Sequence, residues 1–77
     1  MIKLVKNQIT DEGLRILLSY LITDTYTKVL NLTSNQLTAK SLPLLQLFVN
    51  GNNICKTIYI SNNKVNIMQL KKYSGLF

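Results

Sequence analysis

The stretch KVLNLTSNQL, residues 28–37, places an amide where a strand pattern would be expected to bury an apolar side chain. Leu30 and Leu32 alternate with polar neighbours, and this two-residue period predicts a short strand with both leucines facing inward. Asn35 stands three residues after Leu32 and before the next leucine, Leu37. A fold assigned to this sequence must therefore explain why an amide occupies this position.

The same pattern occurs three times at a spacing of 28 residues, as IKLVKNQIT (2–10), LNLTSNQLT (30–38) and IYISNNKVN (58–66). Eight aligned columns keep an apolar residue or Asn in all three copies. The columns are Ile2, Leu30 and Ile58; Leu4, Leu32 and Ile60; Asn7, Asn35 and Asn63; Ile9, Leu37 and Val65; Leu14, Leu42 and Leu70; Leu17, Leu45 and Tyr73; Tyr20, Phe48 and Leu76; and Leu21, Val49 and Phe77. We interpret the chain as one domain, 1–77, of repeat units at about 1–28, 29–56 and 57–77.

The second half of each unit has apolar residues at helical spacing. In the first unit the stripe is formed by Leu14, Leu17, Leu18 and Leu21. Thr10 is predicted to cap this helix, and Thr38 takes the same place in the second unit. The second helix is predicted to end near Gly51, because glycine is common just after a helix. The third helix is predicted to be short or irregular, since Lys71 and Lys72 interrupt its pattern.

This pattern resembles the leucine-rich repeat, L-x-x-L-x-L-x-x-N-x-L, over essentially the whole chain. The 28-residue period with a helical second half is similar to the ribonuclease-inhibitor-like subclass. Thr27 and Cys55 depart from it, because they stand where the signature has its leading Leu. The resemblance implies an α/β solenoid of about three β–α units, with a short parallel sheet on the concave side and helices on the convex side.

The resemblance also implies a structural role for the repeated amide. The chain must turn away from the sheet after each strand, which leaves buried backbone groups in need of partners. An Asn amide can both donate and accept hydrogen bonds. The implied ladder consists of Asn7, Asn35 and Asn63. The alternative is a polar ligand site formed by the same amides, whereas Asn50, Asn52 and Asn53 are interpreted as turn residues.

The sequence has few groups that could perform catalysis. It contains no His and has nine basic residues against three acids, for a net charge of +6. Asp11 and Glu12 are interpreted as helix-start residues and Asp24 as a linker residue, so no carboxylate pair is placed for acid–base chemistry. Cys55 is the only cysteine and is interpreted as a small buried residue. We therefore expect no enzyme activity, catalytic residue, cofactor or metal.

The lone cysteine and the absence of a signal-peptide pattern predict an intracellular, cytoplasmic location. The apolar stretch LRILLSYLI, residues 14–22, is too short to span a bilayer, so no membrane insertion is expected. Solenoids usually need polar caps, which this pattern lacks at both ends. We expect the open ends to be covered by another copy, a partner or the rest of a longer parent protein.

The outward positions of the predicted strands form the candidate binding face. They are Lys3, Val5, Asn31, Thr33, Tyr59 and Ser61. Tyr59 is the candidate anchor, since Tyr is enriched at binding hot spots. The family resemblance implies that such faces bind proteins, so the leading hypothesis is a non-catalytic protein–protein interaction module or scaffold. The alternatives are a solvated face without a partner and binding of nucleic acid or an anionic surface, favoured by the charge and by the recurrence of Lys28 and Lys56.

Overall fold

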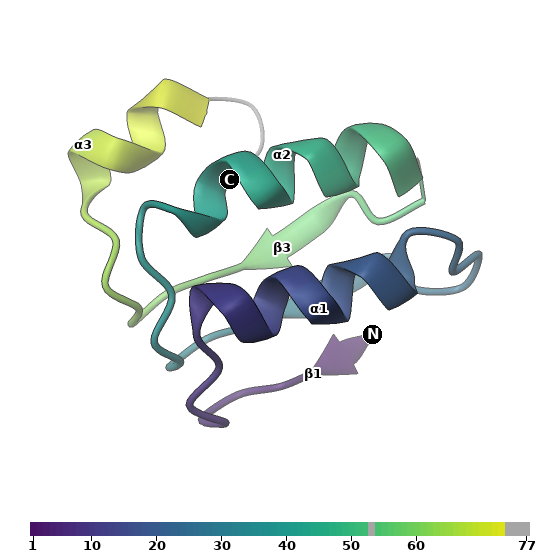
Figure 1. Ribbon diagram of the computed structural model, residues 1–77, viewed down its shortest axis with the longest axis horizontal. Coiled ribbons are helices and arrows are strands. Elements are labelled where there is room, and N and C mark those ends of the chain that lie inside the picture. Colours follow the sequence, from purple (N-terminus) through teal and green to yellow (C-terminus); the bar gives the residue numbers. More distant parts are fainter. Residues whose placement is uncertain (53, 74–77) are drawn as a thin grey trace.

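The computed structural model describes residues 1–52 and 54–73. The chain alternates strands and helices. The elements are β1 (Ile2–Lys3), α1 (Asp11–Leu21), β2 (Val29–Asn31), α2 (Ser41–Asn52), β3 (Thr57–Tyr59), α3 (Ile67–Leu70) and the 3₁₀ turn η1 (Lys71–Tyr73). The strands form a three-stranded parallel sheet in the order β1-β2-β3, and α1 and α2 lie side by side over one face of it (Figure 1). The predicted α/β class and the short parallel sheet are confirmed.

The sheet pairs residues that are 28 positions apart in the sequence. Ile2 pairs with Leu30, and Leu30 pairs with Ile58. The backbone hydrogen bonds repeat with the same offset, because Leu4 N donates to Asn31 O at 2.9 Å and Leu32 N donates to Tyr59 O at 2.8 Å. The columns of the sequence alignment are therefore neighbours in the sheet.

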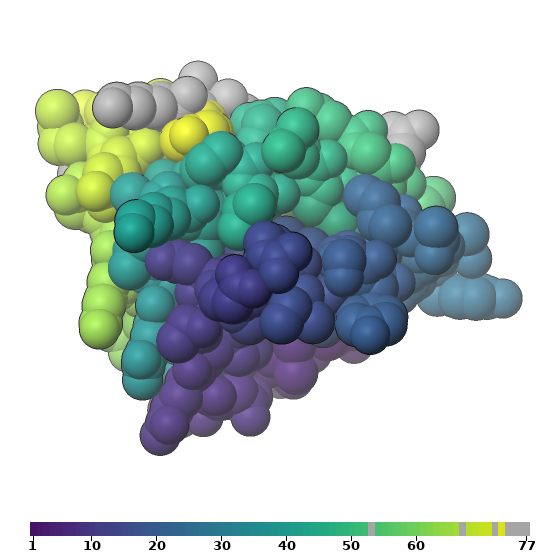
Figure 2. Space-filling view, viewed as in Figure 1, coloured from purple at the N-terminus to yellow at the C-terminus, as the bar shows by residue number. Residues whose placement is uncertain are grey.

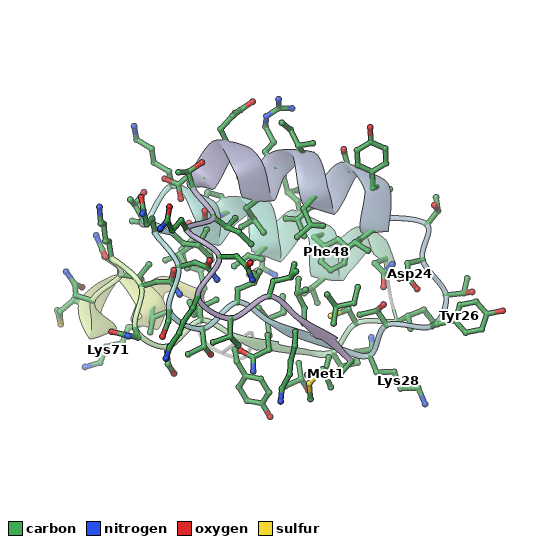
Figure 3. All side chains as sticks on the ribbon, turned by 90° about the horizontal axis from the view of Figure 1, so that it is seen from below. Met1, Asp24, Tyr26, Lys28, Phe48 and Lys71 are labelled. Carbon is green, nitrogen blue, oxygen red and sulfur yellow. The ribbon has the colours of Figure 1, made fainter. Side chains whose placement is uncertain are left out.

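The core fills the space between the sheet and the two long helices. The inward residues of β2 and of the segment after it supply the core together with the stripes of α1 and α2. Six of its leucines are at most 1 % exposed: Leu14, Leu30, Leu32, Leu37, Leu42 and Leu45. Phe48 of α2 also points into this layer (Figure 3). Thr10 caps α1 as predicted, since its Oγ1 accepts a hydrogen bond from Gly13 N at 3.2 Å.

The predicted start of the second helix was wrong. The helix α2 begins at Ser41 rather than directly after Thr38. Pro43 has no N–H, so a helix begun at Ala39 would lose an internal hydrogen bond, whereas a start at Ser41 places Pro43 in the first turn, where backbone N–H groups have no helical partner. The helix also ends at Asn52, so Gly51 lies inside its last turn.

In one aligned column, equivalent residues of the first two units differ in their exposure to solvent. Phe48 is 3 % exposed, but Tyr20 is 78 % exposed. Phe48 lies on the side of α2 that faces α1, where it lines a hollow together with Leu18. The corresponding side of α1 has no helix beside it in the described part of the chain. The third helix is short, as predicted, with α3 covering Ile67–Leu70 only. The columns ending at Leu76 and Phe77, and Asn53, lie outside the described residues.

Candidate functional site

The sheet face opposite the helices carries a row made of one residue from each strand. Lys3 pairs with Asn31, and Asn31 pairs with Tyr59. Because side chains alternate along a strand and Leu30 and Ile58 are buried, these three point to the other side of the sheet. Neighbouring strands lie about 4.8 Å apart, so the row spans about 10 Å. Tyr59 is 48 % exposed and gives this row its large apolar surface.

A second row follows where the strands end. Val5 and Thr33 are partly buried, and Ser61 is exposed. Asn31 Oδ1 accepts hydrogen bonds from Thr33 N at 3.1 Å and from Thr33 Oγ1 at 2.6 Å, so these two side chains hold one another in place. The groups most open to a partner on this face are therefore Lys3, Tyr59 and Ser61.

The amide of Asn35 connects the first two repeat units. Its Oδ1 accepts hydrogen bonds from Asn7 N and Ile9 N, each at 2.9 Å. Its Nδ2 donates to Leu4 O at 2.8 Å and to Leu32 O at 2.9 Å. A single buried side chain therefore provides partners for backbone groups of its own unit and of the preceding one.

Asn63 makes the equivalent bonds one unit later. Its Nδ2 donates to Leu32 O and Ile60 O, each at 2.9 Å, and its Oδ1 accepts from Leu37 N at 3.0 Å. Asn7 is exposed, and its Nδ2 donates to Val5 O at 3.1 Å. These amides bond backbone groups of the turns in which they lie, and they leave no cluster of free amides for a ligand.

The turn that needs these amides has an unusual backbone. Lys6, Ser34 and Asn62 occupy the same place in the three units and have φ angles of 60°, 61° and 59°. This left-handed conformation costs a non-glycine residue roughly 1–2 kcal/mol. The turn directs the chain out of the sheet, and the following amide satisfies the backbone groups that the ladder loses.

A second repeated contact lies at the opposite ends of the strands, and the sequence interpretation missed it. Asp24 and Asn52 are 28 residues apart. Asp24 Oδ1 accepts from Tyr26 N at 2.6 Å and from Thr27 N at 3.0 Å. Asn52 Oδ1 accepts in the same way from the second and third residues after it, at 3.0 Å and 2.9 Å. The alignment contained this signal, because both side chains offer an acceptor oxygen at the same place.

The interpretation of Asn50 and Asn52 as turn residues is wrong, because both lie in α2, and Asn52 also makes contacts outside its own helix. Its Nδ2 donates to Leu21 O and Asp24 O at 2.9 Å and to Ile22 O at 3.1 Å. These carbonyls belong to the end of α1 and the loop after it, where helical partners are absent. Asn52 therefore ties the end of α2 to the end of α1.

Asp11 provides a third contact between units. Its carboxylate accepts hydrogen bonds from Thr38 N at 2.9 Å, from Thr38 Oγ1 at 2.5 Å and from Ser41 Oγ. Burial works to raise the pKa of Asp11, but the hydrogen bonds from Ser41 and Thr38 and the charge of Lys40 together lower it. Asp11 is thus a junction residue between the starts of the two long helices as well as a helix-start residue.

Glu12 and Cys55 are two further residues whose pKa is shifted by their surroundings. Glu12 forms an exposed ion pair with Arg15 at 2.6 Å, and the hydrogen bond from Arg15 lowers the pKa of Glu12. Burial raises the pKa of the Cys55 thiol, which favours its unreactive protonated form. Among residues 1–52 and 54–73, no three His, Cys, Asp or Glu side chains are grouped closely enough to hold a metal ion.

The helix layer has a hollow that the sequence interpretation also missed. It measures about 340 Å³ and lies at the boundary of α1 and α2, whose surfaces meet along the face seen in Figure 2. The lining residues are Arg15, Leu18, Ser19, Ile22, Leu44, Leu47 and Phe48. The segment LPLLQLF, residues 42–48, could have indicated it, since a helix that is apolar all round leaves apolar side chains outside a one-sided core.

Comparison of the chain with protein-family models, with curated proteins and with solved structures found no match. No helix in the described residues has the length and apolar character that crossing a membrane requires.

Proposed function

We propose that the chain is a non-catalytic protein-interaction module of the leucine-rich-repeat type. It binds a protein partner through the sheet face opposite the helices, which we call the strand face. The observation that carries the proposal is the register that aligns Lys3, Asn31 and Tyr59 in one row. The binding face consists of this row and the one after it: Lys3, Val5, Asn31, Thr33, Tyr59 and Ser61.

The strand face suits binding because its side chains project from a hydrogen-bonded frame. Ordering long, mobile side chains costs binding free energy, whereas groups already held in position lose less entropy. Asn31 and Thr33 are fixed by mutual hydrogen bonds. Tyr59 adds a stiff side chain with an apolar ring and a polar tip, which is the kind of group that dominates interface energetics.

Three repeated features support the leucine-rich-repeat assignment. The strands pair at a constant 28-residue offset, the turns after them share a left-handed residue, and the following Asn bonds the backbone of adjoining units. In this proposal the units form a short solenoid with the strands on its concave side. The absence of catalysis in this proposal is supported by the surroundings of three reactive residues. The carboxylates of Asp11 and Asp24 accept hydrogen bonds from backbone N–H groups, and Cys55 is buried.

The test compares two double variants of matched size. The first, Tyr59→Ala with Lys3→Ala, alters the strand face. The second, Arg15→Ala with Lys40→Ala, alters exposed positions near the helices. Partners are isolated with the unaltered chain as bait, and the dissociation constant of each variant is then measured by calorimetry.

We expect the strand-face variant to bind at least about tenfold more weakly, with its melting temperature almost unchanged. The helix-side variant should bind as the unaltered chain does. A loss confined to the helix-side variant would contradict the proposal and move the site to the hollow between α1 and α2, which Arg15 lines.

One observation favours a second candidate, binding of a polyanion. Lys56 N donates a hydrogen bond to Lys28 O at 3.1 Å, so these exposed lysines lie on adjacent segments just before β2 and β3. With a net charge of +6 they could form a short basic stripe. A steep fall of affinity for mixed DNA or RNA with rising salt, reduced in Lys28→Ala, would support this candidate. A flat salt dependence would exclude it.

A further inference from the structure

The outer strands of the sheet direct backbone groups away from it in a fixed order, and two of these groups, Val5 O and Ile60 O, accept hydrogen bonds from the side chains of Asn7 and Asn63. In the described residues β1 and β3 are the outer strands. Leu4 N and Lys6 N donate toward β2. Because successive backbone groups alternate in direction along a strand, the N–H and C=O of Lys3 and Val5 point away from the sheet. The N–H and C=O of Ile60 likewise point outward from the other edge, since Tyr59 O and Ser61 O accept from β2.

We propose that a second copy of this chain stacks head to tail on the first, with β1 of the second copy pairing in parallel with β3 of the first. The head face is the β1 edge with α1, and the tail face is the β3 edge with the turn after it. The register follows from the one inside the chain. Leu32 N donates to Tyr59 O, so the same offset places Ile60 N opposite Lys3 O of the second copy.

The amide ladder continues across this junction. Among the described residues no hydrogen bond reaches the Oδ1 of Asn7, whereas the Oδ1 of Asn35 accepts from Asn7 N and Ile9 N. In the stack, Asn7 of the second copy occupies the place of Asn35. Its Oδ1 then accepts from Asn63 N and Val65 N of the first copy, and its Nδ2 is directed to Ile60 O.

The apolar surfaces of the two faces also correspond. The tail face has a pocket of about 250 Å³ beside β3, lined by Ile58, Tyr59, Ile60, Ser61, Asn62, Val65 and Leu70. The head face offers Ile2, Leu4 and Ile9, which are partly buried. Their equivalents in the second unit, Leu30, Leu32 and Leu37, are at most 1 % exposed. Of α3, only Leu70 lines this pocket. In the proposal, apolar side chains of the head face of another copy fill it.

Two further side chains of the head face lack the cover that their equivalents have. Ile16 is 48 % exposed and Tyr20 is 78 % exposed. Their equivalents in α2 are Leu44 and Phe48, and both line the boundary with α1. In the stack, α3 and η1 of the other copy would lie on this side of α1.

Net charge sets the salt dependence of this association. Each copy carries +6, so two copies repel one another and added salt reduces the repulsion. Stacking is therefore strengthened by salt, whereas binding to a polyanion is weakened by it. This difference separates the stacking proposal from the polyanion-binding candidate.

The first test removes one outward N–H from the head face. Lys3→Pro deletes a donor that β2 does not use, at an edge position where proline is tolerated. Lys3→Ala is the matched control, because it removes the same side chain and charge but keeps the N–H. Sedimentation velocity measures the concentration at half-association for each chain. We expect Lys3→Pro to raise that concentration about tenfold relative to Lys3→Ala.

The second test uses complementation and shows that the interface joins two different faces. Val65→Lys places a charge on the tail face and leaves the head face intact, while Lys3→Pro does the reverse. At the concentration at which the unaltered chain is half-associated, each variant alone should be mostly monomeric. Their mixture should form dimers that grow no further, because only the head face of the Val65→Lys chain and the tail face of the Lys3→Pro chain are unaltered. Circular dichroism verifies the fold of each variant, and Leu70→Lys replaces Val65→Lys if the latter is unfolded.

These experiments can overturn the proposal in three ways. The unaltered chain could remain monomeric at about 1 mM in high salt. Lys3→Pro and Lys3→Ala could associate equally well. The two folded variants could fail to form a dimer when mixed. Any one of these results excludes head-to-tail stacking of copies through the sheet edges.

Discussion

Replacing Asn35 with Ala should be among the most damaging single changes in this chain. The substitution removes an acceptor for Asn7 N and Ile9 N, both at 2.9 Å, and a donor for Leu4 O at 2.8 Å. Leu32 O and Thr33 O also lose a bond, but Leu32 O keeps the one from Asn63 and Thr33 O keeps the one from Lys6 N. The other three backbone groups, Asn7 N, Ile9 N and Leu4 O, lose their side-chain partner.

The expected cost follows from these groups. An intramolecular hydrogen bond contributes about 1 kcal/mol net, and an orphaned buried group costs more. Three such losses give a change of about 3 kcal/mol in the free energy of unfolding. A 77-residue domain is expected to have roughly 4–12 kcal/mol in total. The melting temperature should fall by roughly 12–24 °C.

Urea denaturation followed by circular dichroism measures this change, and two other asparagines provide the controls. Asn50→Ala changes an exposed position on α2 and should be neutral or slightly stabilising, since Ala is the better helix former. Asn63→Ala should cost somewhat less than Asn35→Ala, because its Oδ1 accepts one backbone bond instead of two. Equal, small effects of Asn35→Ala and Asn50→Ala would refute the structural role of the amide.

Three further predictions concern the core, the titration of an acid and the backbone. Leu32→Ala removes a fully buried side chain and should lower the free energy of unfolding by roughly 2–5 kcal/mol in urea melts; a cost below about 1 kcal/mol would contradict its central place. The pKa of Asp11 is lowered from its ordinary value of 3.8, so its stabilising effect is full above that pH and is lost as the pH falls through the folded-state pKa. Thermal melts should therefore show declining stability below about pH 4, and Asp11→Asn should reduce this decline; an unchanged pH profile would show that the contacts of Asp11 with Thr38 and Ser41 do not depend on its charge. Lys6→Gly should stabilise the fold by up to about 1 kcal/mol, because glycine adopts the left-handed conformation at φ 60° without the cost borne by other residues; Lys6→Ala, which keeps that cost, is the control, and an equal effect of both would refute the explanation.

Much of the fold was predictable because each repeat supplies the same information three times. Alternation at Leu30 and Leu32 predicts a strand, and the constant offset then predicts its neighbours. The start of α1 was also predictable, since Thr10 has the side chain that caps a helix. These features depend on local chemistry and on a period, and both can be observed in one sequence.

The second helix shows where repetition misleads. Thr38 stands in the place of Thr10, but Pro43 changes which hydrogen bonds the following residues can make, and α2 starts later. Tyr20 and Phe48 show a second limit. Both belong to one apolar column, but burial depends on whether another helix lies beside that side of the unit. A position in a repeat predicts orientation, whereas burial requires knowledge of the neighbours.

The exposed row of the candidate site could be predicted from the sequence, but the contacts that join the repeat units could be predicted only in part. The exposed row with Lys3 and Tyr59 follows from alternation and the offset alone. The contacts of Asn52 with carbonyls of the preceding unit did not follow, because nothing in its local sequence distinguishes it from a turn residue. Such contacts depend on how close two helix ends come in space.

The polar contacts between units have a direction that bears on how further units could join. Asn35 and Asn52 each reach back to backbone groups of the preceding unit. The first unit has Asp24 in place of Asn52, and an ionised carboxylate has no N–H with which to reach back to the end of another helix. It nevertheless keeps an amide at Asn7, whose Oδ1 is able to accept. A unit placed before the first one could therefore form the hydrogen bonds of the sheet and of the Asn ladder, but not the contact that Asn52 makes between helix ends. We therefore expect copies to meet at the sheet edges rather than at the loops beside Asp24.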